Sequence, residues 1–476
     1  MSKTQTTSAD SPRSRAGLDL LVDVTGPRLR ASLTDALRDA VRSGRLVAGT
    51  RLPASRVLAT DLGIARSTVT ECYAELVAEG WLTAQQGSGT RVATLVRPLT
   101  EPTAAAVTGP DDRRAIQGLV PGSADFAEFP RQQWLAAARR ALAAAPYSAF
   151  GYGDPAGRME LRTALAGYLS RVRGVQTEAE RIVICSGFHH GLALVAEALA
   201  GRGAQAIAVE SYGLDLYRAL LSEAGLRIPP LTVDDQGARI RELRDLEVGA
   251  VLLTPAHQFP TGVALSPERR AAVLDWARST DGFILEDDYD GEFRYDRKPV
   301  GALQGLDPER VVYFGTASKS LAPALRVAWM VLPESLLRDV LAAKGRVETV
   351  SVLDQLTLAE FIASGAFDRH VRSRRQNYRR RRDQLIAALA RRAPDVRVRG
   401  MAAGLQAVLE LPAGTEGAVL RAAAASGLIV SGMAEYRHEA LDPSTVDDGL
   451  VINYSAISDS AWEGALDLLC SVMPGR

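Results

Sequence analysis

The chain has 476 residues, of which 47% are hydrophobic and 24% are charged, a composition typical of a globular protein with two or three domains. Its 56 basic and 56 acidic residues cancel, so a nucleic-acid-binding function must rest on local pattern rather than on overall charge. No apolar run reaches the roughly 18 to 20 residues that a membrane helix needs, and we expect no membrane partner. Three widely spaced cysteines predict neither a disulfide framework nor a metal site, and they favour the cytoplasm as the location.

Residues 28–93 follow a polar segment, residues 1–27, that we expect to be a flexible tail. Three helical patterns and then a hairpin pattern occupy this stretch, which is the layout of a winged helix-turn-helix. Apolar residues recur every three or four positions in the helical patterns. We expect helices over 28–44, 56–62 (with Ser55 as its cap) and 65–80, and two strands over 81–92 around a turn at 86–89.

The start of the third helical pattern carries the residues that DNA reading requires. A recognition helix enters the major groove with small and polar side chains at its N-terminus, and Arg66, Ser67 and Thr68 meet that need. An arginine at a helix start is also a common solvated residue, and helix-turn-helix units occur in protein-interaction modules. The whole stretch 29–92, however, resembles the GntR family of bacterial regulators. That resemblance implies contacts with a double-stranded DNA operator at Arg56, Arg66, Ser67 and Thr68, with Gln86 and Gly87 on the wing.

Residues 94–118 are rich in proline, threonine, alanine and charge without periodicity, which predicts a linker. From residue 119 to residue 476, apolar strand-like runs alternate with helical ones, which predicts an α/β domain with an at least partly parallel sheet. The whole chain is therefore expected to be multidomain, with an α-helical head and an α/β body. The strand-like runs are RIVICSG, QAIAVES, GAVLLTP, GFILEDD, RVVYFGT and LRVAWMVLP.

The α/β part offers a candidate for each group that pyridoxal phosphate needs. Lys319, one of only four lysines, follows an apolar strand and is the candidate for the Schiff base, although a surface lysine is the plainer interpretation. Asp287 would pair with the pyridine nitrogen and Tyr289 would donate to the phenolic oxygen, whereas an acidic turn at 286–288 could also be a solvated or metal-binding one. The phosphate candidates are Thr316, Arg326 and the backbone N–H groups of Ser186, Gly187 and Phe188 at a helix start.

Four motifs stand in the order and spacing of fold-type-I aminotransferases: FGYGDPAGRMELRTALAGYL, TPAHQFPTG, ILEDDYDGEF and SKSLAPALR. The sequences of these motifs most resemble those of the MocR/GabR group, which joins a GntR-type head to such a domain. The resemblance implies a large α/β domain, a small C-terminal α+β domain and a homodimer in which Tyr152 of one subunit reaches the phosphate of the other. It also implies that Ser318, His257 and Gln258 lie near the cofactor.

Two departures from that pattern bear on function. Where the group usually has E-D-P-G-Y, this chain has Glu210 to Leu214, so the ring-stacking aromatic is replaced by leucine and Tyr212 is left as a possible substitute. Residues 450–458, LVINYSAIS, hold no arginine where aminotransferases bind the substrate carboxylate. A buried substrate carboxylate would be poorly neutralised without that arginine, which argues against efficient turnover of an ordinary amino acid.

We therefore expect a DNA-binding transcription regulator that senses pyridoxal phosphate or its adduct with an amine, and that controls vitamin B6 or amine and amino-acid metabolism. A small-molecule effector, a DNA operator and a second subunit are its expected partners. The alternative is an active aminotransferase that carries a DNA-binding head, for which Lys319, Asp287 and Tyr289 are the required set. A third possibility is a degenerate cofactor domain that serves only to dimerise the heads.

Overall fold

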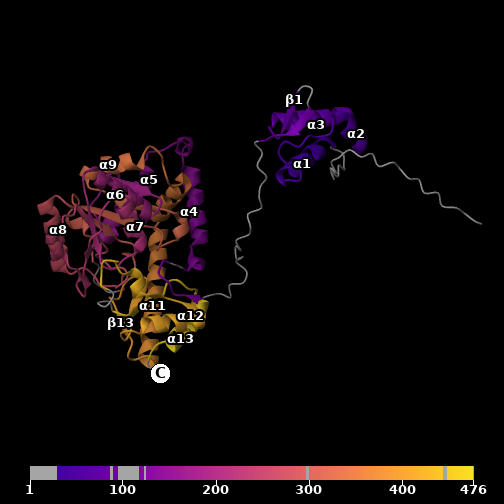
Figure 1. Cartoon of the computed structure of the whole chain (residues 1–476). Helices are drawn as coiled ribbons and strands as arrows, with labels where there is room; N and C mark the ends of the chain where they lie inside the picture. The colour runs from indigo at the N-terminus through magenta and orange to yellow at the C-terminus, as the bar shows by residue number, and fades with distance from the viewer. Residues whose placement is uncertain are drawn as a thin grey trace, which may run out of the picture. The chain divides into compact units, whose positions relative to one another are not determined.

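The computed structural model describes residues 29–85, 89–94, 117–122, 125–295, 300–442 and 447–474. These residues belong to two compact units that divide between residues 113 and 114, and each unit is described by itself (Figure 1). The predicted tail, most of the predicted linker, and the wing residues Gln86 and Gly87 lie outside the described residues.

The N-terminal unit consists of three helices and an antiparallel hairpin. Its helices pack through Leu33, Leu37, Val69 and Leu76, all of which are buried. This agrees with the predicted helical faces. The second helix differs in one detail, because Ser55 is its first residue and Ala54 occupies the cap position without a capping side chain. The elements are α1 (Leu29–Arg42), α2 (Ser55–Leu62), α3 (Arg66–Ala78), β1 (Leu82–Gln85) and β2 (Gly89–Val92).

The second unit is built on a seven-stranded sheet in the order β4-β12-β11-β10-β9-β5-β6. Strand β12 is antiparallel to both of its neighbours, and the other pairs are parallel. All six strand-like runs of the sequence form strands of this sheet. Their bounds are β4 (Ile182–Cys185), β5 (Ile207–Glu210), β6 (Pro230–Leu231), β9 (Ala250–Leu253), β10 (Phe283–Asp287), β11 (Val311–Thr316) and β12 (Ala328–Val331).

Helices cover both faces of this sheet, because successive residues of its strands point to opposite sides and both sets are largely apolar and buried. Ile182 and Ile184 of β4 pack with one helix layer, whereas Val183 and Cys185 pack with the other. The first layer holds α5 (Met159–Arg173) and α8 (Pro267–Thr280), and the second holds α6 (Phe188–Gly201), α7 (Asp215–Glu223) and α9 (Glu334–Lys344). Helix α10 (Val352–Ala363) packs on α5, and α4 (Arg131–Ala144) packs on α10.

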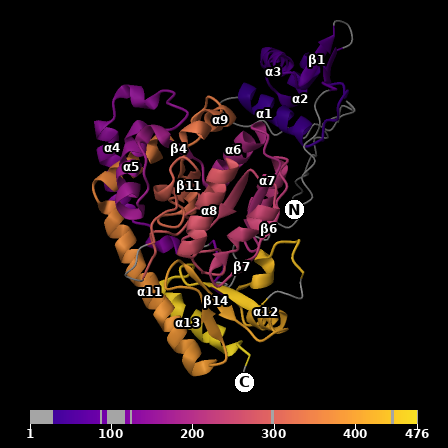
Figure 2. The ribbon, with the colours of Figure 1, turned by 90° about the vertical axis from the view of Figure 1, so that its left-hand side faces the viewer.

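The C-terminal part of this unit is a smaller α+β layer. The long helix α11 (Ala366–Arg392) runs from the side of the large sheet into this part (Figure 2). An antiparallel sheet follows in the order β13-β14-β17-β16, and helices α12 (Glu416–Ala425) and α13 (Asp459–Ser471) accompany it. The strands are β13 (Arg397–Arg399), β14 (Gln406–Glu410), β16 (Ser431–Gly432) and β17 (Gly449–Asn453), while β15 (Leu428–Ile429) pairs with β3 (Gln117–Gly118) and β7 (Val233–Asp234) with β8 (Gly237–Ala238).

The predicted architecture of a winged helix-turn-helix head with a large α/β and a small α+β part is confirmed. Among the residues that the structure describes, no helix is both long and apolar enough to cross a bilayer. Because β5, β9, β10 and β11 run parallel, their carboxyl ends meet at one edge of the large sheet. The predicted cofactor residues follow these strand ends.

Candidate cofactor site and DNA-binding head

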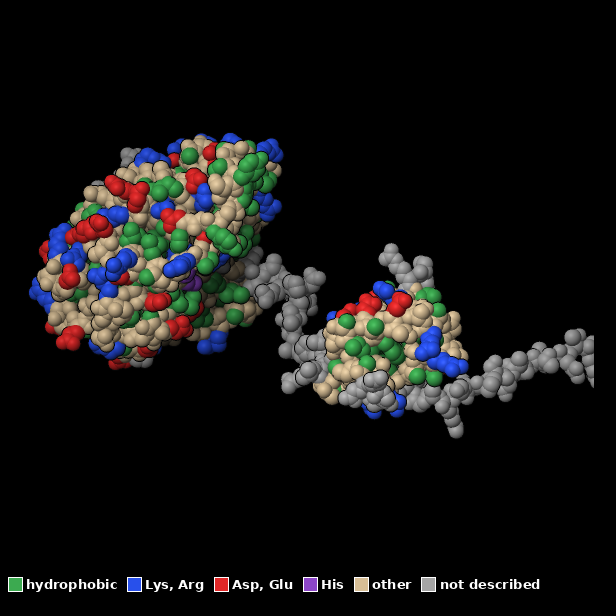
Figure 3. Space-filling view, turned by 90° about the horizontal axis from the view of Figure 1, so that it is seen from above, with side chains coloured by type: hydrophobic (Ala, Val, Ile, Leu, Met, Phe, Trp, Pro, Cys, Tyr) green, Lys and Arg blue, Asp and Glu red, His purple; other side chains and the backbone are tan. Residues whose placement is uncertain are grey.

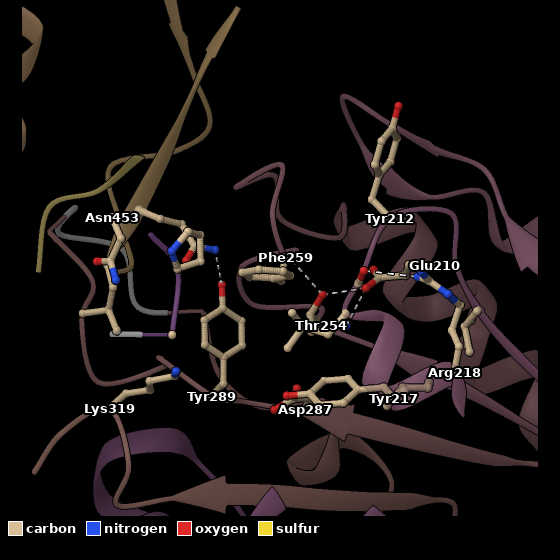
Figure 4. A pocket seen from close by; sticks show the side chains of 18 residues that line it. Glu210, Tyr212, Tyr217, Arg218, Thr254, Phe259, Asp287, Tyr289, Lys319 and Asn453 are labelled. Carbon is tan, nitrogen blue, oxygen red and sulfur yellow. Dashed lines mark hydrogen bonds between the residues drawn. The ribbon is translucent and has the colours of Figure 1, made fainter. Parts of the chain in front are cut away.

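A cavity lies at the carboxyl edge of the large sheet, where the small C-terminal part faces it. Lys319, Asp287 and Tyr289, which the sequence predicted for three different groups of the cofactor, all line this one cavity (Figure 4). The small part contributes Gln406 at the start of β14 and Asn453 at the end of β17. The cavity is therefore assembled from segments that are more than 100 residues apart in the chain.

Lys319 follows β11 and is largely withdrawn from solvent. Burial lowers the pKa of its amine below the ordinary value, while the carboxylates of Asp287 and Asp290 act in the opposite direction. A neutral amine is the nucleophilic form of lysine, and a depressed pKa makes that form easier to reach near neutral pH. Lys319 thus has the environment of a reactive lysine rather than that of a surface one.

Asp287 is the last residue of β10 and is only 4% exposed. Burial raises its pKa well above the ordinary value, and repulsion by Asp288 and Asp290 adds to the effect. A buried carboxylate in such a position gains from a cationic partner, which a protonated pyridine nitrogen would supply. The neighbouring Asp288 is not available for this role, because it pairs with the buried guanidinium of Arg173 at 2.6 Å.

The phosphate candidates follow or precede neighbouring strands at the same sheet edge as the cavity, although none of them is among the residues that line it. Thr316, Ala328 and Cys185 are aligned across β11, β12 and β4, which brings Thr316 and Ser186 to the same sheet edge. Arg326 donates from Nη2 to the carbonyl oxygen of Ser186 at 2.6 Å. Thr316 Oγ1 lies 2.9 Å from Ser318 Oγ and accepts a hydrogen bond from the Ser318 amide.

Gly187 makes this arrangement possible. It occupies the cap position of α6 with φ +99, and no described side chain caps the helix there. A Cβ at residue 187 would lie 2.5 Å from Nη2 of Arg326, so only glycine lets the guanidinium approach the helix start so closely. The amide of Ser186 donates to Nδ1 of His190 at 3.1 Å, whereas the helix start at Gly187 has no side-chain cap, and backbone N–H groups there beside a guanidinium suit a phosphate. Together with the lysine and the buried carboxylate, these features fit pyridoxal phosphate, which when bound supplies an aldehyde carbon that bonds to amines and a ring that withdraws electrons.

Three further predicted residues, Phe188, Gln258 and His257, do not line the cavity but contact residues that do. Phe188 begins α6 and packs on Tyr217 with ring centroids 4.6 Å apart. Gln258 is buried behind the cavity wall, where Nε2 donates to the carbonyl oxygen of Tyr212 at 2.9 Å. His257 contacts the hydroxyl of Tyr289, with Nδ1 3.0 Å from Oη.

Two tyrosines bear on the missing ring-stacking aromatic. Tyr212 is half-buried, and its ring points away from Asp287 and Lys319 (Figure 4). Tyr217, which the sequence did not single out, lines the cavity beside Asp287, and burial raises the pKa of its hydroxyl well above the ordinary value. Leu214, at the position where the related motif has tyrosine, also lines the cavity. Tyr217 is therefore the aromatic nearer to the predicted ring position.

Glu210 is a second cavity residue that the sequence did not single out as functional. It ends β5, and its Oε2 accepts hydrogen bonds from the amide and the hydroxyl of Thr254. Burial raises its pKa to about 7. Its position after a parallel strand, next to the ends of β9 and β10, is a signal that could have identified it.

Tyr152 does not line the cavity of its own chain. Its side chain is fully exposed, as is that of Tyr147 nearby. The predicted contact of Tyr152 with the phosphate requires a second subunit, and it stays a prediction.

In the head, the predicted DNA-reading side chains are solvent-accessible. Arg66 begins α3, and Arg66, Ser67 and the α2 residue Arg56 are exposed, while Thr68 is half-buried. Neither Arg56 nor Arg66 forms an ion pair with any residue in the described part of the chain. Arg38 in α1, by contrast, pairs with Glu79 at 2.9 Å and so ties the helices together.

Both units match known protein families. Residues 122–441 match the model of aminotransferase class I and II, and residues 29–92 match that of the bacterial regulatory proteins of the gntR family. The protein is thus of the class that joins a winged DNA-binding head to an aminotransferase-type domain. Domains of this type bind pyridoxal phosphate, so the predicted cofactor is confirmed at the level of the family.

Curated relatives share both units. The chain is 34% identical to the HTH-type transcriptional regulator YdeL of Bacillus subtilis, over 79% of this chain and 82% of that one. It is 32% identical to the probable rhizopine catabolism regulatory protein MocR of Rhizobium meliloti (92% and 96%), and 31% identical to the pyridoxine biosynthesis transcriptional regulator PdxR of Corynebacterium glutamicum (89% and 91%). The chain belongs to the gntR family of bacterial regulators, in the MocR-type group with an aminotransferase-like domain.

Solved structures agree with the fold of the second unit. An archaeal alanine:glyoxylate aminotransferase superposes with a TM-score of 0.68 at 24% identity, over 75% of this chain and 90% of that one. The α-aminoadipate aminotransferase LysN of Thermus thermophilus gives a TM-score of 0.65 at 22% identity, over 75% and 92%. These likenesses establish an aminotransferase fold.

Proposed function

We propose that the protein is a transcription regulator whose affinity for operator DNA responds to pyridoxal phosphate held at Lys319. Residues 28–93 would bind DNA, residues 94–118 would link them to the cofactor domain, and residues 119–476 would hold the cofactor. The single observation that carries this proposal is the cavity shared by Lys319, Asp287 and Tyr289 in a chain that also carries an exposed recognition helix. We place its action in the cytoplasm, where operator DNA and free cofactor are both available.

The chemistry of the cavity favours the cofactor, or its adduct with a simple amine, as the signal. Asn453 occupies the end of β17, the late strand on which aminotransferases carry a carboxylate-binding arginine. Arg218 also lines the cavity, with Nη1 and Nη2 donating to the carbonyl oxygens of Gly213 and Arg437 and with Nε left without a partner among the described residues. The late strand thus offers a substrate carboxylate no guanidinium, and Arg218 has only its Nε–H uncommitted. The relatives named for pyridoxine biosynthesis and rhizopine catabolism support vitamin B6 or amine metabolism as the regulated pathway.

A homodimer accounts for the apolar surface of the cofactor unit. Apolar side chains gather along one edge of the face seen in Figure 3. Exposed large hydrophobic residues cluster in sequence around α4, the segment after it and the start of α5: Leu135, Leu142, Tyr147, Phe150, Tyr152 and Met159. Contiguous exposed apolar patches mark interaction sites, and a second copy of the chain is the occupant that would also carry Tyr152 to a neighbouring phosphate. We expect Leu135→Asp to shift the protein toward monomer in sedimentation experiments, whereas Val57→Asp, at an exposed apolar residue of the head, should not.

The proposal is tested by titrating operator DNA with and without pyridoxal phosphate. Wild type should change its apparent Kd on cofactor addition, and Lys319→Ala should not. Lys344→Arg serves as the lysine control, because it removes a lysine that does not line the cavity while it keeps the positive charge at that position, and it should leave the response intact. Identical binding by wild type and Lys319→Ala in every condition would contradict the proposal.

An active aminotransferase with a DNA-binding head is the second candidate. The observation in its favour is that Lys319, Asp287 and Tyr289 all line the cavity. It predicts sustained turnover of an amino acid with a keto acid and loss of that turnover in Lys319→Ala. Sustained turnover would show that the cofactor domain does more than report cofactor levels.

A further inference from the structure

A buried hydrogen-bonded group stands behind the cavity wall and reaches Tyr289. The imidazole Nδ1 of His257 lies 2.8 Å from Oδ2 of Asp290 and 3.0 Å from Oη of Tyr289. On its other side Tyr289 Oη accepts a hydrogen bond from Nε2 of Gln406 at 3.2 Å. None of these four side chains is more than 9% exposed, so they form hydrogen bonds with one another or with groups in the cavity rather than with bulk water.

The position of the His257 ring is restricted by two glycines. A Cβ at Gly404 would lie 2.1 Å from the imidazole Cε1, and a Cβ at Gly262 would lie 3.3 Å from Nε2. Both glycines have positive φ angles, +75 and +72. The imidazole thus occupies space that a side chain at residue 404 would fill, and it lies tilted by 36° to the ring of Tyr289.

The surroundings of the two ring nitrogens select one tautomer. Nε2 is buried without a hydrogen-bond partner in the described part of the chain, and a buried N–H without an acceptor is the rarer and costlier case. Nδ1 faces the Asp290 carboxylate, which when ionised can only accept. The proton therefore belongs on Nδ1, and His257 cannot accept the hydroxyl proton of Tyr289.

We propose that His257 and Asp290 form a positioning pair that keeps the Tyr289 hydroxyl proton free to donate into the cavity. Asp290 accepts the Nδ1–H of His257, and Gln406 donates to Oη, so neither His257 nor Gln406 takes the hydroxyl proton, which stays available for the cofactor's phenolic oxygen. This inference rests on the proposed cofactor site and adds two residues to it that do not touch the cofactor themselves.

Asp290→Asn tests the proposal, because asparagine keeps the shape of the side chain but replaces the negative charge that selects the Nδ1–H tautomer by a neutral amide, which can turn its NH2 group toward Nδ1. His257 can then carry its proton on Nε2, accept the Tyr289 hydroxyl at Nδ1 and withdraw that donor from the cavity. A hydroxyl donor from Tyr289 would stabilise negative charge on the phenolic oxygen of bound cofactor, so withdrawing that donor would raise the pH at which the lysine–cofactor linkage becomes deprotonated. The pH midpoint of the cofactor's visible absorption band should rise by about one to two units for a lost hydrogen bond to a charged group.

The Asp290 charge by itself has the opposite effect. A carboxylate near Lys319 favours the protonated, cationic form, so deleting the charge alone lowers the midpoint. The proposal is therefore measured as a double-mutant cycle with Tyr289→Phe, which has no hydroxyl to withdraw. The shift caused by Asp290→Asn should be more positive in the wild-type background than in the Tyr289→Phe background by about one unit or more.

His257→Ala is the control, because it removes the group that would capture the proton. In that background Asp290→Asn should lose its upward shift, and thermal unfolding of each variant reports whether the fold is retained. Equal shifts in the wild-type and Tyr289→Phe backgrounds would overturn the positioning role while leaving the cofactor site intact. Absence of any visible band in cofactor-treated wild type would instead overturn the cofactor site itself, and the positioning role with it.

Discussion

Gly187→Ala should weaken cofactor binding more than any other single methyl addition in the described α6 region. Gly187 has φ +99 and ψ 165, a combination that is essentially restricted to glycine. The added Cβ would stand 2.5 Å from Nη2 and 2.8 Å from Cζ of Arg326. The guanidinium must therefore leave the helix start, and with it the hydrogen bond to the carbonyl oxygen of Ser186.

The substitution has two effects, one on folding stability and one on cofactor affinity, and different measurements report them. A non-glycine residue at such a backbone conformation costs about 1–3 kcal/mol of folding stability. Displacing Arg326 removes a charged hydrogen bond at the phosphate site, which is worth about 1.5–3 kcal/mol, or about 10- to 100-fold in the Kd for pyridoxal phosphate. The first contribution lowers the thermal unfolding midpoint, and the second appears only in cofactor affinity.

Gly203→Ala is the matched control for this experiment. Gly203 follows α6 with φ +93, and a Cβ there meets nothing within 4 Å. It should lose stability comparably while keeping wild-type cofactor affinity. Both affinities are measured by titrating cofactor-free protein with pyridoxal phosphate and following the visible absorption band. Equal Kd values for wild type and Gly187→Ala would refute the assignment of the phosphate to the start of α6.

Three further predictions follow from buried and exposed charges. Asp288→Asn should destabilise the cofactor unit by about 3–5 kcal/mol in chemical denaturation, because it strands the buried guanidinium of Arg173; an unchanged unfolding midpoint would contradict this. Glu210 has a folded pKa raised from 4.5 to about 7, so the stability of its neutral form is fully present below pH 4.5 and is lost as pH rises through 7. The Glu210→Gln variant should therefore lose less stability than wild type over that pH range, as measured by thermal unfolding. Parallel pH profiles for the two proteins would refute the raised pKa of Glu210. Arg66→Ala should weaken operator binding by about 1–3 kcal/mol in fluorescence anisotropy. Arg38→Ala, which breaks the ion pair with Glu79 inside the head, should instead mainly lower stability. The reverse result would show that the DNA contacts lie elsewhere.

The sequence predicted most accurately those features that are encoded locally. Each strand of the large sheet is a short apolar run, and a residue suited to cofactor chemistry directly follows several of these runs. Asp287 ends β10, and Lys319 comes three residues after the end of β11. Because parallel strands bring such ends together, the order of motifs along the chain was enough to place these residues in one cavity.

The residues that the sequence did not identify depend on contacts across long separations. Gln406 and Asn453 reach the cavity only because α11 carries the chain into the small part, whose sheet then faces the large one. Tyr217 lies three positions beyond the motif residue that it accompanies, on a helix turn that local pattern does not mark as functional. The partnership of His257 with Asp290 likewise joins two loops, 33 residues apart, whose approach is a property of the folded sheet.

We expect the cofactor to be bound covalently by Lys319, and borohydride reduction followed by mass spectrometry can locate that bond. Borohydride reduction of cofactor-treated protein makes a lysine–pyridoxyl bond permanent, and mass spectrometry of the digested chain then locates it. The sequence has only four lysines, Lys3, Lys298, Lys319 and Lys344, so the assignment is unambiguous. The account predicts a single modification at Lys319, absent from Lys319→Ala. Modification at another lysine instead, or none at all, would contradict it.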